Sequence, residues 1–461
     1  MRGVIWFRED LRTSDNPALY HATQKCRDGL LAVYLIDTAF WNKHDIAACR
    51  VEFLLRGLIA LQTELEALNI PLHVIQLHKN QTAEKVLLHC IESIQAEKLF
   101  FNRQYEIDEC RRDQVVEQYL AAHRISCHSY HDQVILPPNA VKTQQNSYFK
   151  IFTPFKKTWL KVLETHEAAL HLLPKPKPQP IITIETTSIP ATIKGFTSET
   201  PSQLWPAGEI HAQQQLTQFI QTQLKHYDKN RDFPSVEGTS KLSPYLTAGM
   251  ISAKQCFKSA LQYQSNEGAQ TWMSELIWRE FYKHLLAKVP RLSMNKPYQL
   301  KTLRLPWQDD EQALQAWQQG QTGVPIIDAA MRQLNTIGWM HNRLRMIVAM
   351  FLARNLMLDW RLGEKYFMQH LIDGDLAANN GGWQWCAGTG ADVAPYFRVF
   401  NPIRQSLRFD PEGQFIRHYC PELKNLDNRA IHAPWEAGFP APMIDLGFSR
   451  SRFIAAFKAL G

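Results

Sequence analysis

The chain has 461 residues, of which 45% are hydrophobic and 21% charged, values typical of a globular protein with a packed core. This length exceeds the usual size of a single core, so we expect two domains. The 51 Lys and Arg residues against 44 Asp and Glu give a formal charge of +7, which suits a nucleic-acid partner without demanding one.

Neither secretion nor membrane insertion is predicted. The N-terminal MRGVIWFREDLR places charged residues before any signal-like apolar core, and the apolar runs are too short to span a bilayer. The eight cysteines are scattered, without a C-x-x-C pair or the spacing typical of metal ligands. We therefore expect reduced thiols, no metal site and a cytoplasmic location.

Residues 1–131 alternate between helical stretches and short apolar runs. The helical stretches lie at 47–68, 82–95 and 106–123. This alternation predicts an α/β domain with a parallel, Rossmann-like sheet. FREDLRTSDNP follows the first apolar run in place of G-x-G-x-x-G, so a dinucleotide in the usual Rossmann position is not expected. The apolar runs, which predict buried strands, are GVIWF (3–7), LLAVYLI (30–36), PLHVIQL (71–77) and KLFFN (98–102).

The second part of the chain is predicted to be helical. Residues 174–206 are rich in Pro, Thr and Ser and lack a helical period, and we take the connection to begin near 132. The predicted division is an α/β domain at 1–131, an interdomain linker at 132–206 and an all-α domain at 207–461. Apolar residues at three- and four-residue spacing mark helices at 210–227, 269–289, 328–338 and 341–358, and ten of the 13 tryptophans lie at or after residue 205.

One loop of the second part has the chemistry of an anion site. In GTSKLSPYLTAG (238–249), Thr239, Ser240 and Ser243 precede or adjoin Pro244, a residue favoured at the first position of a helix. Free backbone N–H groups beside hydroxyls bind anions well. The alternative interpretation is that Ser243 is an ordinary N-cap.

Two helical segments carry charges on faces that would otherwise be core. Trp272, Glu275, Arg279 and Tyr282 share one face of the helix at 271–286, and this mixture predicts either a ligand-facing stripe or an ion-paired seam between helices. In GWMHNRLRMIVAMF (338–351), Asn342, Arg345 and Met346 fall within one turn. Arg345 needs an acidic partner, which Asp373 or Asp375 of DGDLAANNGGWQWCAGTG (373–390) could supply.

The order of these segments resembles the photolyase/cryptochrome family. The motifs are Y-D-x-x-R-D-F-P, G-T-S-x-L-S, E-L-I-W-R-E-F, G-W-M-H-N-R-L-R-M, D-G-D-L-A-A-N-N-G-G-W-Q-W and P-Y-F-R-x-F-N-P. Within the family the chain is most similar to bacterial class I cyclobutane pyrimidine dimer (deoxyribodipyrimidine) photolyases with a folate antenna. The resemblance extends from VIWFREDLR at 4–12 to at least PEL at 421–423.

The resemblance implies FAD inside the helical domain. Asp373 and Asp375 would border the polar edge of the flavin ring, Arg345 would pair with Asp373, and Asn379 would face flavin N5. An amide at N5 suits the reduced anion, because it can hydrogen-bond without adding a charge. The remaining residues implied to contact FAD are Tyr227, Thr239, Ser240, Lys241, Leu242, Ser243, Trp272, Glu275 and Arg279.

Three tryptophans match the family's electron-transfer chain. Trp383 corresponds to the member nearest the flavin, with Trp360 in the middle and Trp307 outermost. The alternative is that each is a core aromatic, the commoner fate of a buried tryptophan.

The resemblance also implies how UV-damaged DNA is bound. Trp278 and Trp385 would embrace a flipped-out dimer, and Glu275, Asn342 and Met346 would contact it. Relatives that repair (6-4) photoproducts carry a histidine pair at this turn, whereas His341 is followed here by Asn342, so the cyclobutane dimer is the expected lesion. Arg231, Arg343 and Arg398 are candidates for phosphate contacts, with solvated surface charge as the alternative for each.

A second chromophore is implied in the first domain. His44, Asp108 and Glu109 match positions that contact 5,10-methenyltetrahydrofolate in folate-type relatives. Three residues depart from the pattern: Asp108 replaces the usual Asn, and Ser293 and Met294 replace Cys and Lys.

The predicted function is light-driven DNA repair. Reduced FAD (FADH⁻) would donate an electron to the flipped dimer and split the cyclobutane ring, in a protein that the resemblance implies to be monomeric. The alternative is a cryptochrome, a light sensor without repair activity. Only residues 424–461 follow the last motif, and the presence of Trp278, Trp385, Asn342 and Met346 favours the enzyme. A flavin oxidoreductase is disfavoured because no nicotinamide site is identifiable.

Overall fold

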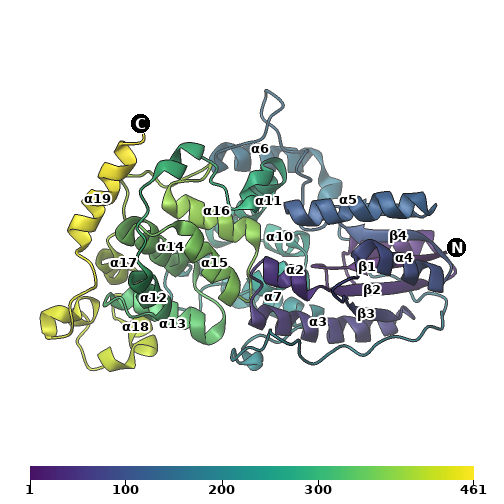
Figure 1. Cartoon of the computed structure of the whole chain (residues 1–461), viewed down its shortest axis with the longest axis horizontal. Coiled ribbons are helices and arrows are strands. Elements are labelled where there is room, and N and C mark those ends of the chain that lie inside the picture. Colours follow the sequence, from purple (N-terminus) through teal and green to yellow (C-terminus); the bar gives the residue numbers. More distant parts are fainter.

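A computed structural model describes residues 1–461, apart from the side chains of residues 167 and 168. The N-terminal part is built on a five-stranded sheet, and the C-terminal part is helical (Figure 1). The predicted fold class, an α/β domain followed by an all-α domain, is confirmed.

All five strands are parallel, in the order β3-β2-β1-β4-β5. Four of them match predicted strands closely. The fifth, β5, was not predicted: its residues are half-buried or exposed, so it lacks a continuous apolar run. The strands are β1(Arg2–Phe7), β2(Leu30–Ile36), β3(Leu72–Gln76), β4(Ala96–Asn102) and β5(Ser126–Tyr130).

Helices cover both faces of the sheet. Val4 and Trp6 pack with residues of α4(Ala83–Ser93) and α5(Ile107–Ala122). Ile5 and Phe7 point to the opposite face and pack with α1(Pro17–Lys25) and α3(Ala48–Glu66). Burial on both faces explains why the central strands are almost uniformly apolar. A short helix, α2(Thr38–Lys43), follows β2.

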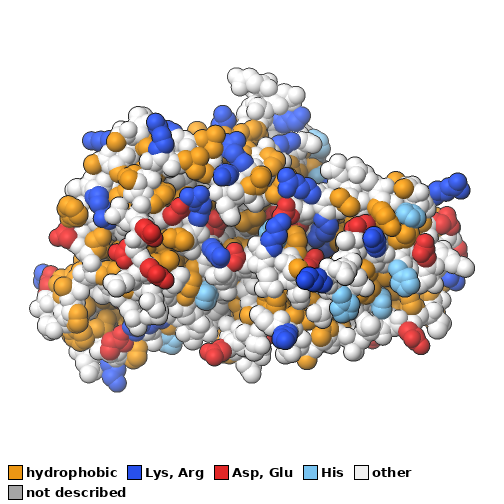
Figure 2. Space-filling view, viewed as in Figure 1, with side chains coloured by type: hydrophobic (Ala, Val, Ile, Leu, Met, Phe, Trp, Pro, Cys, Tyr) orange, Lys and Arg blue, Asp and Glu red, His pale blue; other side chains and the backbone are white. Residues whose placement is uncertain are grey.

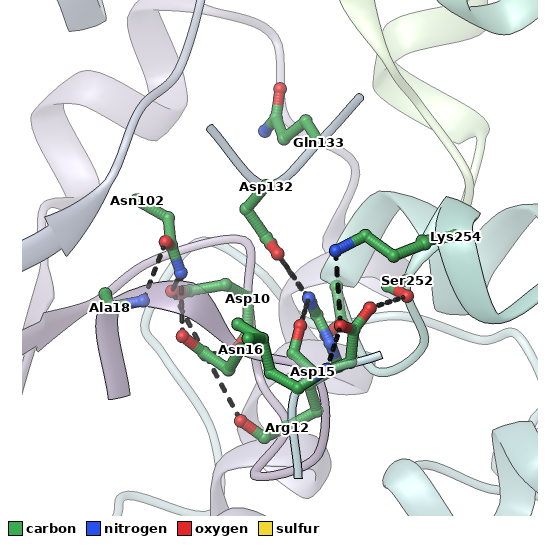
Figure 3. Close-up of polar contacts among 12 residues, drawn as sticks. Asp10, Arg12, Asp15, Asn16, Ala18, Asn102, Asp132, Gln133, Ser252 and Lys254 are labelled. Carbon is green, nitrogen blue, oxygen red and sulfur yellow. Dashed lines mark hydrogen bonds and ion pairs between the residues drawn. The ribbon is translucent and has the colours of Figure 1, made fainter. Parts of the chain in front are cut away.

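Acidic side chains fill the turn after β1, where a Rossmann domain would hold phosphates (Figure 3). Asp10 accepts hydrogen bonds from the backbone N–H of Arg8 at 2.7 Å and from Asn102 Nδ2 at 2.6 Å. Burial and the nearby Asp132 raise the pKa of the Asp10 carboxyl. This turn is therefore a structural joint and not a phosphate cradle.

The same turn binds the α/β part to the rest of the chain (Figure 3). The guanidinium of Arg12 pairs with Asp132 and donates to the carbonyl of Gly249 at 3.1 Å. Asp15 accepts from Ser252 Oγ at 2.6 Å. Arg12, Asp15 and Asp132 are all nearly inaccessible to solvent, so this joint is a buried polar network.

Residues 132–206 contain one long helix and an extended stretch. The helix α6(Phe152–Thr165) packs on the helical part, although no helix was predicted in this segment. The extended stretch passes β3: Gln179 N–H bonds to Leu68 O at 2.8 Å before this strand, and Thr187 N–H donates to His73 Nδ1 within it at 3.4 Å. The division into 1–131, 132–206 and 207–461 stays a prediction.

The helical part contains all the predicted helices, with two changed in form. The stretch 210–227 is divided, because its first helix ends at Thr222 and a 3₁₀ turn follows at Leu224–His226. The stretch 341–358 is not one regular helix, because α14(Asn342–Met350) gives way to a π-helical turn at Phe351–Leu356. The helices are α7(Glu209–Thr222), α8(Tyr227–Asn230), α9(Ser243–Ala248), α10(Ala253–Leu261), α11(Glu267–Lys288), α12(Glu311–Gln319), α13(Pro325–Ile337), α14(Asn342–Met350), α15(Trp360–His370), α16(Leu376–Ala387), α17(Pro402–Phe409), α18(Gln414–Tyr419) and α19(Leu446–Lys458).

The visible surface mixes both signs of charge. Figure 2 shows basic side chains interspersed with acidic ones on this face, in keeping with the modest net charge. Within the chain as described, none of the helices combines the length and apolar character that crossing a bilayer requires.

Candidate functional site

A cavity of about 510 Å³ opens within the helical part. Its walls come from α9, α11, α14 and α16 and from the turn before α16. The volume falls within the range of ordinary ligand sites. Fifteen residues that sequence analysis singled out line it: Arg231, Ser243, Glu275, Trp278, Arg279, Tyr282, Asn342, Arg343, Arg345, Met346, Asp373, Asp375, Asn379, Trp383 and Trp385.

A bidentate ion pair forms one polar wall of the cavity. Arg345 Nη2 donates to both carboxylate oxygens of Asp373, at 3.0 and 2.8 Å. Asp373 is therefore the acidic partner that Arg345 required. Its side chain is almost fully buried, so the pair is fixed in place.

Asp375 lies on the cavity wall and caps α16. It accepts from Ala378 N–H at 2.9 Å and contacts Lys283 Nζ at 2.7 Å. Lys283, buried on α11, also contacts Glu106 Oε1 at 3.2 Å. Burial raises the pKa of the Asp375 carboxyl, but Lys283 and Arg279 outweigh that effect and hold it below its usual value. Asp375 is therefore a stable anion.

Asn379 is oriented by the neighbouring helix. Its Nδ2 donates to the carbonyl oxygen of Glu364 on α15 at 2.9 Å, which leaves Oδ1 as the free acceptor of a residue that lines the cavity. The amide thus supplies an uncharged hydrogen-bonding group.

The three candidate electron-transfer tryptophans lie on segments of the chain that contact one another. Trp383 lines the cavity and is 2% exposed, and a side chain at Gly363 would overlap its ring. Trp360 lies one turn before Gly363 on α15 and is buried. Trp307 is half-buried, and the next residue forms a bridge to Leu358. Trp383 is thus on the cavity wall, and Trp307 is the most exposed of the three.

Aromatic and polar side chains from α11, α14 and α16 also line the cavity. Trp278 on α11 and Trp385 on α16 are half-buried, and Asn342 is exposed at the start of α14. Glu275 pairs with Arg231 Nη1 at 2.6 Å. The stripe on α11 is thus both a cavity wall and an ion-paired seam, so the two interpretations of the sequence hold together.

The candidate phosphate contacts differ in their surroundings. Arg231 and Arg343 lie on the cavity rim and both contact Asp232, Arg343 at 2.7 Å. Arg398 is exposed and lies outside the cavity. His341 is buried, and burial lowers the pKa of its imidazole to about 4.

The structure does not place every candidate flavin contact on the cavity wall. Ser243 is the first residue of α9 and not its N-cap, and its hydroxyl accepts from Trp339 Nε1 at 3.2 Å. Tyr227 is buried beneath Arg231, and Trp272 packs on Phe219. The loop residues Thr239, Ser240, Lys241 and Leu242 and the buried Tyr227 and Trp272 are absent from the cavity lining as described.

Sequence reasoning missed several wall residues because their side chains have the character of core. A Trp at 339, directly after the glycine that ends α13, was a signal that could have been used. The missed residues are Leu246, Thr247, Trp339, Met340, Ala349, Phe367, Leu371, Ala378, Gly382 and Cys386.

A smaller cavity, of about 110 Å³, lies between the two parts of the chain. His44, Glu106, Glu109 and Asp375 line it. Burial, followed by the charge of Glu106, raises the pKa of the Glu109 carboxyl to about 8, and its Oε2 has no hydrogen-bond partner among the described residues. Asp108 does not line this cavity; it pairs with Lys43 at 2.6 Å, which lowers the pKa of its carboxyl.

Comparison with known proteins decides the family. The chain is 43% identical to a deoxyribodipyrimidine photo-lyase of Vibrio cholerae, in an alignment that covers 99% of both chains. The chain belongs to the DNA photolyase family. Residues 3–179 match the family description DNA photolyase, and residues 272–459 match the FAD binding domain of DNA photolyase.

Solved photolyase-family structures share the whole fold. A class III photolyase from Agrobacterium tumefaciens superposes with a TM-score of 0.91 at 34% identity, over 100% of this chain and 97% of that chain. A cryptochrome from Synechocystis superposes with a TM-score of 0.88 at 27% identity, over 99% of each chain. The helical part is therefore a photolyase-type FAD-binding domain.

The large cavity fits FAD on its own chemistry. A side chain at Gly382 would meet nothing within 4 Å, so the backbone of α16 leaves room for a ring on this side. Trp383 Nε1 lacks a hydrogen-bond partner among the described residues. The Arg345–Asp373 pair, Asp375 and Asn379 supply polar groups, while Arg279 supplies a cation suited to phosphate.

Proposed function

We propose that this protein is a deoxyribodipyrimidine photo-lyase that uses light to split cyclobutane pyrimidine dimers in DNA. The observation that carries the proposal is that one cavity holds both a flavin-type polar wall and the pair Trp278 and Trp385. Full-length identity of 43% to a photo-lyase supports the same activity.

Arg345, Asp373, Asp375 and Asn379 would hold the flavin ring, and Arg279 with the loop 239–243 would hold its phosphates. When bound, reduced and excited by light, FAD supplies the electron that opens the cyclobutane ring. Asn379 offers its Oδ1 without a negative charge, so it does not oppose a reduced anion next to it. Trp383, Trp360 and Trp307 would carry an electron from the surface to the flavin.

Trp278 and Trp385 would receive the dimer out of the DNA stack, as photolyases do with their target bases. A fused dimer stacks and pairs poorly, which lowers the cost of extruding it. Asn342 and Met346 would contact its base edges. Glu275 is held in place by Arg231 and would accept a hydrogen bond from the dimer.

The protonation state of His341 supports the cyclobutane dimer as the lesion. With its pKa near 4, the imidazole is neutral at neutral pH, and its Nδ1 accepts from Arg343 N–H at 3.2 Å. The turn therefore offers no cationic acid, and splitting a cyclobutane ring needs none.

Arg231, Arg343 and Arg398 would bind phosphates around the lesion. Arg231 and Arg343 share Asp232, which keeps both guanidinium groups on the rim before DNA arrives. Binding through phosphates predicts that affinity falls as salt concentration rises. We expect the enzyme to act as a cytoplasmic monomer.

We propose 5,10-methenyltetrahydrofolate as the antenna in the smaller cavity. Glu109, protonated near neutral pH and with a free Oε2, offers the hydrogen bonds that a pterin ring requires. The present volume of about 110 Å³ is small for a ligand pocket, so binding requires side chains on its wall to move. Asp108 would act on His44, which lies 3.3 Å away, and not on the ligand directly.

The decisive experiment is illumination of reduced holoprotein with an oligonucleotide that contains one thymine dimer. We expect light-dependent restoration of two thymines, and no restoration in the dark. A protein that binds and photoreduces FAD but leaves the dimer intact would instead be a cryptochrome. No light-dependent restoration by fully reduced protein would overturn the proposal.

A further inference from the structure

The indole of Trp278 is stacked on Phe152, a residue of the segment predicted to be a linker. The two ring centroids are 3.6 Å apart, and the ring planes differ by 9°. Such parallel overlap is closer than the usual separation of aromatic pairs in proteins. Phe152 is the first residue of α6, and its backbone N–H donates to Asp392 Oδ2 at 2.8 Å.

The two rings have different surroundings. Trp278 is half-buried and lines the large cavity, whereas Phe152 is 7% exposed and is absent from the cavity lining as described. A planar ring has two faces, so Phe152 covers the face of the indole that points away from the cavity. Phe281 and Tyr282 also contact the indole, but their planes are inclined to it by 79° and 34°, so neither is stacked on its other face.

The rest of α6 is anchored on α11, which makes Phe152 a fixed support. Phe155 packs on Phe281, with ring centroids 5.2 Å apart, and the indole N–H of Trp159 donates to buried Glu280. Lys156 Nζ donates to Ser274 Oγ at 3.1 Å. The helix cannot slide along α11 without breaking these contacts. Phe152 itself also packs edge-on against Phe281, with ring centroids 5.9 Å apart, which restricts the plane of its ring.

We infer that Phe152 is a positioning residue for lesion recognition, which acts by holding the plane of Trp278. This inference rests on the proposed function. An extruded dimer gains stacking energy only if the indole is parallel to it, and the stack on Phe152 fixes that plane before DNA binds. Loss of the support would leave the plane of Trp278 held only by edge-on or tilted contacts with Phe281 and Tyr282.

The test compares Phe152→Leu with Phe155→Leu in FAD-loaded full-length protein. Both variants remove a buried ring from α6, but only Phe152 stacks on Trp278. We expect Phe152→Leu to weaken Kd for dimer-containing DNA roughly fivefold to tenfold, with unchanged Kd for undamaged DNA and unchanged FAD content. Phe155→Leu should lower the melting temperature and leave the dimer Kd within about twofold.

A double-variant cycle separates positioning from general stability. In a Trp278→Leu background, Phe152→Leu should change the dimer Kd by less than about twofold, because the ring it supports is gone. Equal effects of Phe152→Leu and Phe155→Leu on dimer binding would overturn the inference. If the wild-type protein did not prefer dimer-containing DNA, the proposed function itself would fail.

Discussion

At the scale of single residues, the cavity combines fixed charges with oxidisable rings, of which Trp383 is the most buried. Trp383 is buried, lies on the cavity wall and makes no hydrogen bond through Nε1 within the described chain. Its neighbours Phe367 and Trp317 have ring centroids 5.1 and 6.0 Å from its own. We expect these aromatic neighbours to keep the site well packed when the indole of Trp383 is replaced by a smaller ring.

Trp383→Phe should abolish light-driven reduction of bound FAD, because phenylalanine is much harder to oxidise than tryptophan. Repair by chemically reduced protein should remain largely intact, since the dimer contacts lie elsewhere. Absorbance during illumination, followed by a repair assay, measures both. Photoreduction at the wild-type rate would show that the assigned electron chain is wrong.

Glu109 makes stability depend on pH. Its pKa is raised from an ordinary value near 4.5 to about 8, so the folded protein holds a proton that the unfolded chain has lost. The stability it contributes is complete below pH ~4.5 and is lost as pH rises through about 8. The folding stability of the wild-type protein should therefore fall by roughly 2–4 kcal/mol over this range, and Glu109→Gln should not show this fall.

Melting temperatures at pH 5, 7 and 9 measure this effect. The variant should become more stable relative to wild type as pH rises. Glu92→Gln, at an exposed position in α4, is the control and should leave the pH profile unchanged. Parallel profiles for wild type and Glu109→Gln would contradict the assignment.

At the scale of elements, hydrophobic patterning predicted most of the fold. The central strands β1 and β2 are buried on both faces and are almost uniformly apolar, and β3 and β4 each keep buried apolar residues, whereas SCHSY in β5 gives no such signal at the sheet edge. The sequence of helix α6 does have helical apolar spacing, with Phe152, Phe155, Trp159 and Leu163 buried. This pattern was missed because the neighbouring sequence is rich in proline. The charged wall of the cavity was predictable because buried charges need partners, whereas its apolar wall resembles core.

The paired glycines of α16 belong to this scale, because each faces a different surface. A side chain at Gly381 would overlap the ring of Tyr282 on α11, whereas one at Gly382 would point into open space on the cavity wall. Gly381→Ala should lower stability by about 1–3 kcal/mol through overpacking. Gly382→Ala should raise the stability of the apoprotein by up to about 1 kcal/mol, since alanine favours helix.

FAD titration distinguishes the two glycine variants further. Gly382→Ala should bind FAD more weakly than wild type, because its methyl group occupies cavity space. Thermal melting without FAD and absorbance of the bound flavin are the measurements. A stable Gly382→Ala protein with normal FAD content would show that this side of the helix does not face the flavin.

At the scale of the whole molecule, the α/β and helical parts are joined by buried charge. Arg12 lies in the turn after β1, pairs with Asp132 and donates to Gly249 O in the helical part. Arg50 on α3 makes a similar link by donating to Gly374 O at 2.6 Å. The guanidinium groups of Arg12 and Arg50 thus help to fix the position of the cavity walls relative to the sheet.

Arg12→Met should destabilise the protein by about 3–5 kcal/mol, because it leaves Asp132 buried without its cation. Arg12→Met combined with Asp132→Leu should recover much of this loss, since neither charge remains. Urea unfolding of the wild type, both single variants and the double variant closes the cycle. Additive effects of the two substitutions would show that the pair is not coupled.

Lys283 contacts both Asp375 and Glu106 and therefore couples the two cavities electrostatically. A ligand that neutralises or displaces Glu106 leaves the ammonium group to Asp375 alone, and so alters the field at the polar wall of the flavin cavity. Linkage is reciprocal, so a molecule that binds Asp375 must change the affinity of the smaller cavity for its own ligand by the same factor. If the smaller cavity holds the proposed antenna, replacing that ligand by one of different charge should therefore also change the electrostatics of the flavin site.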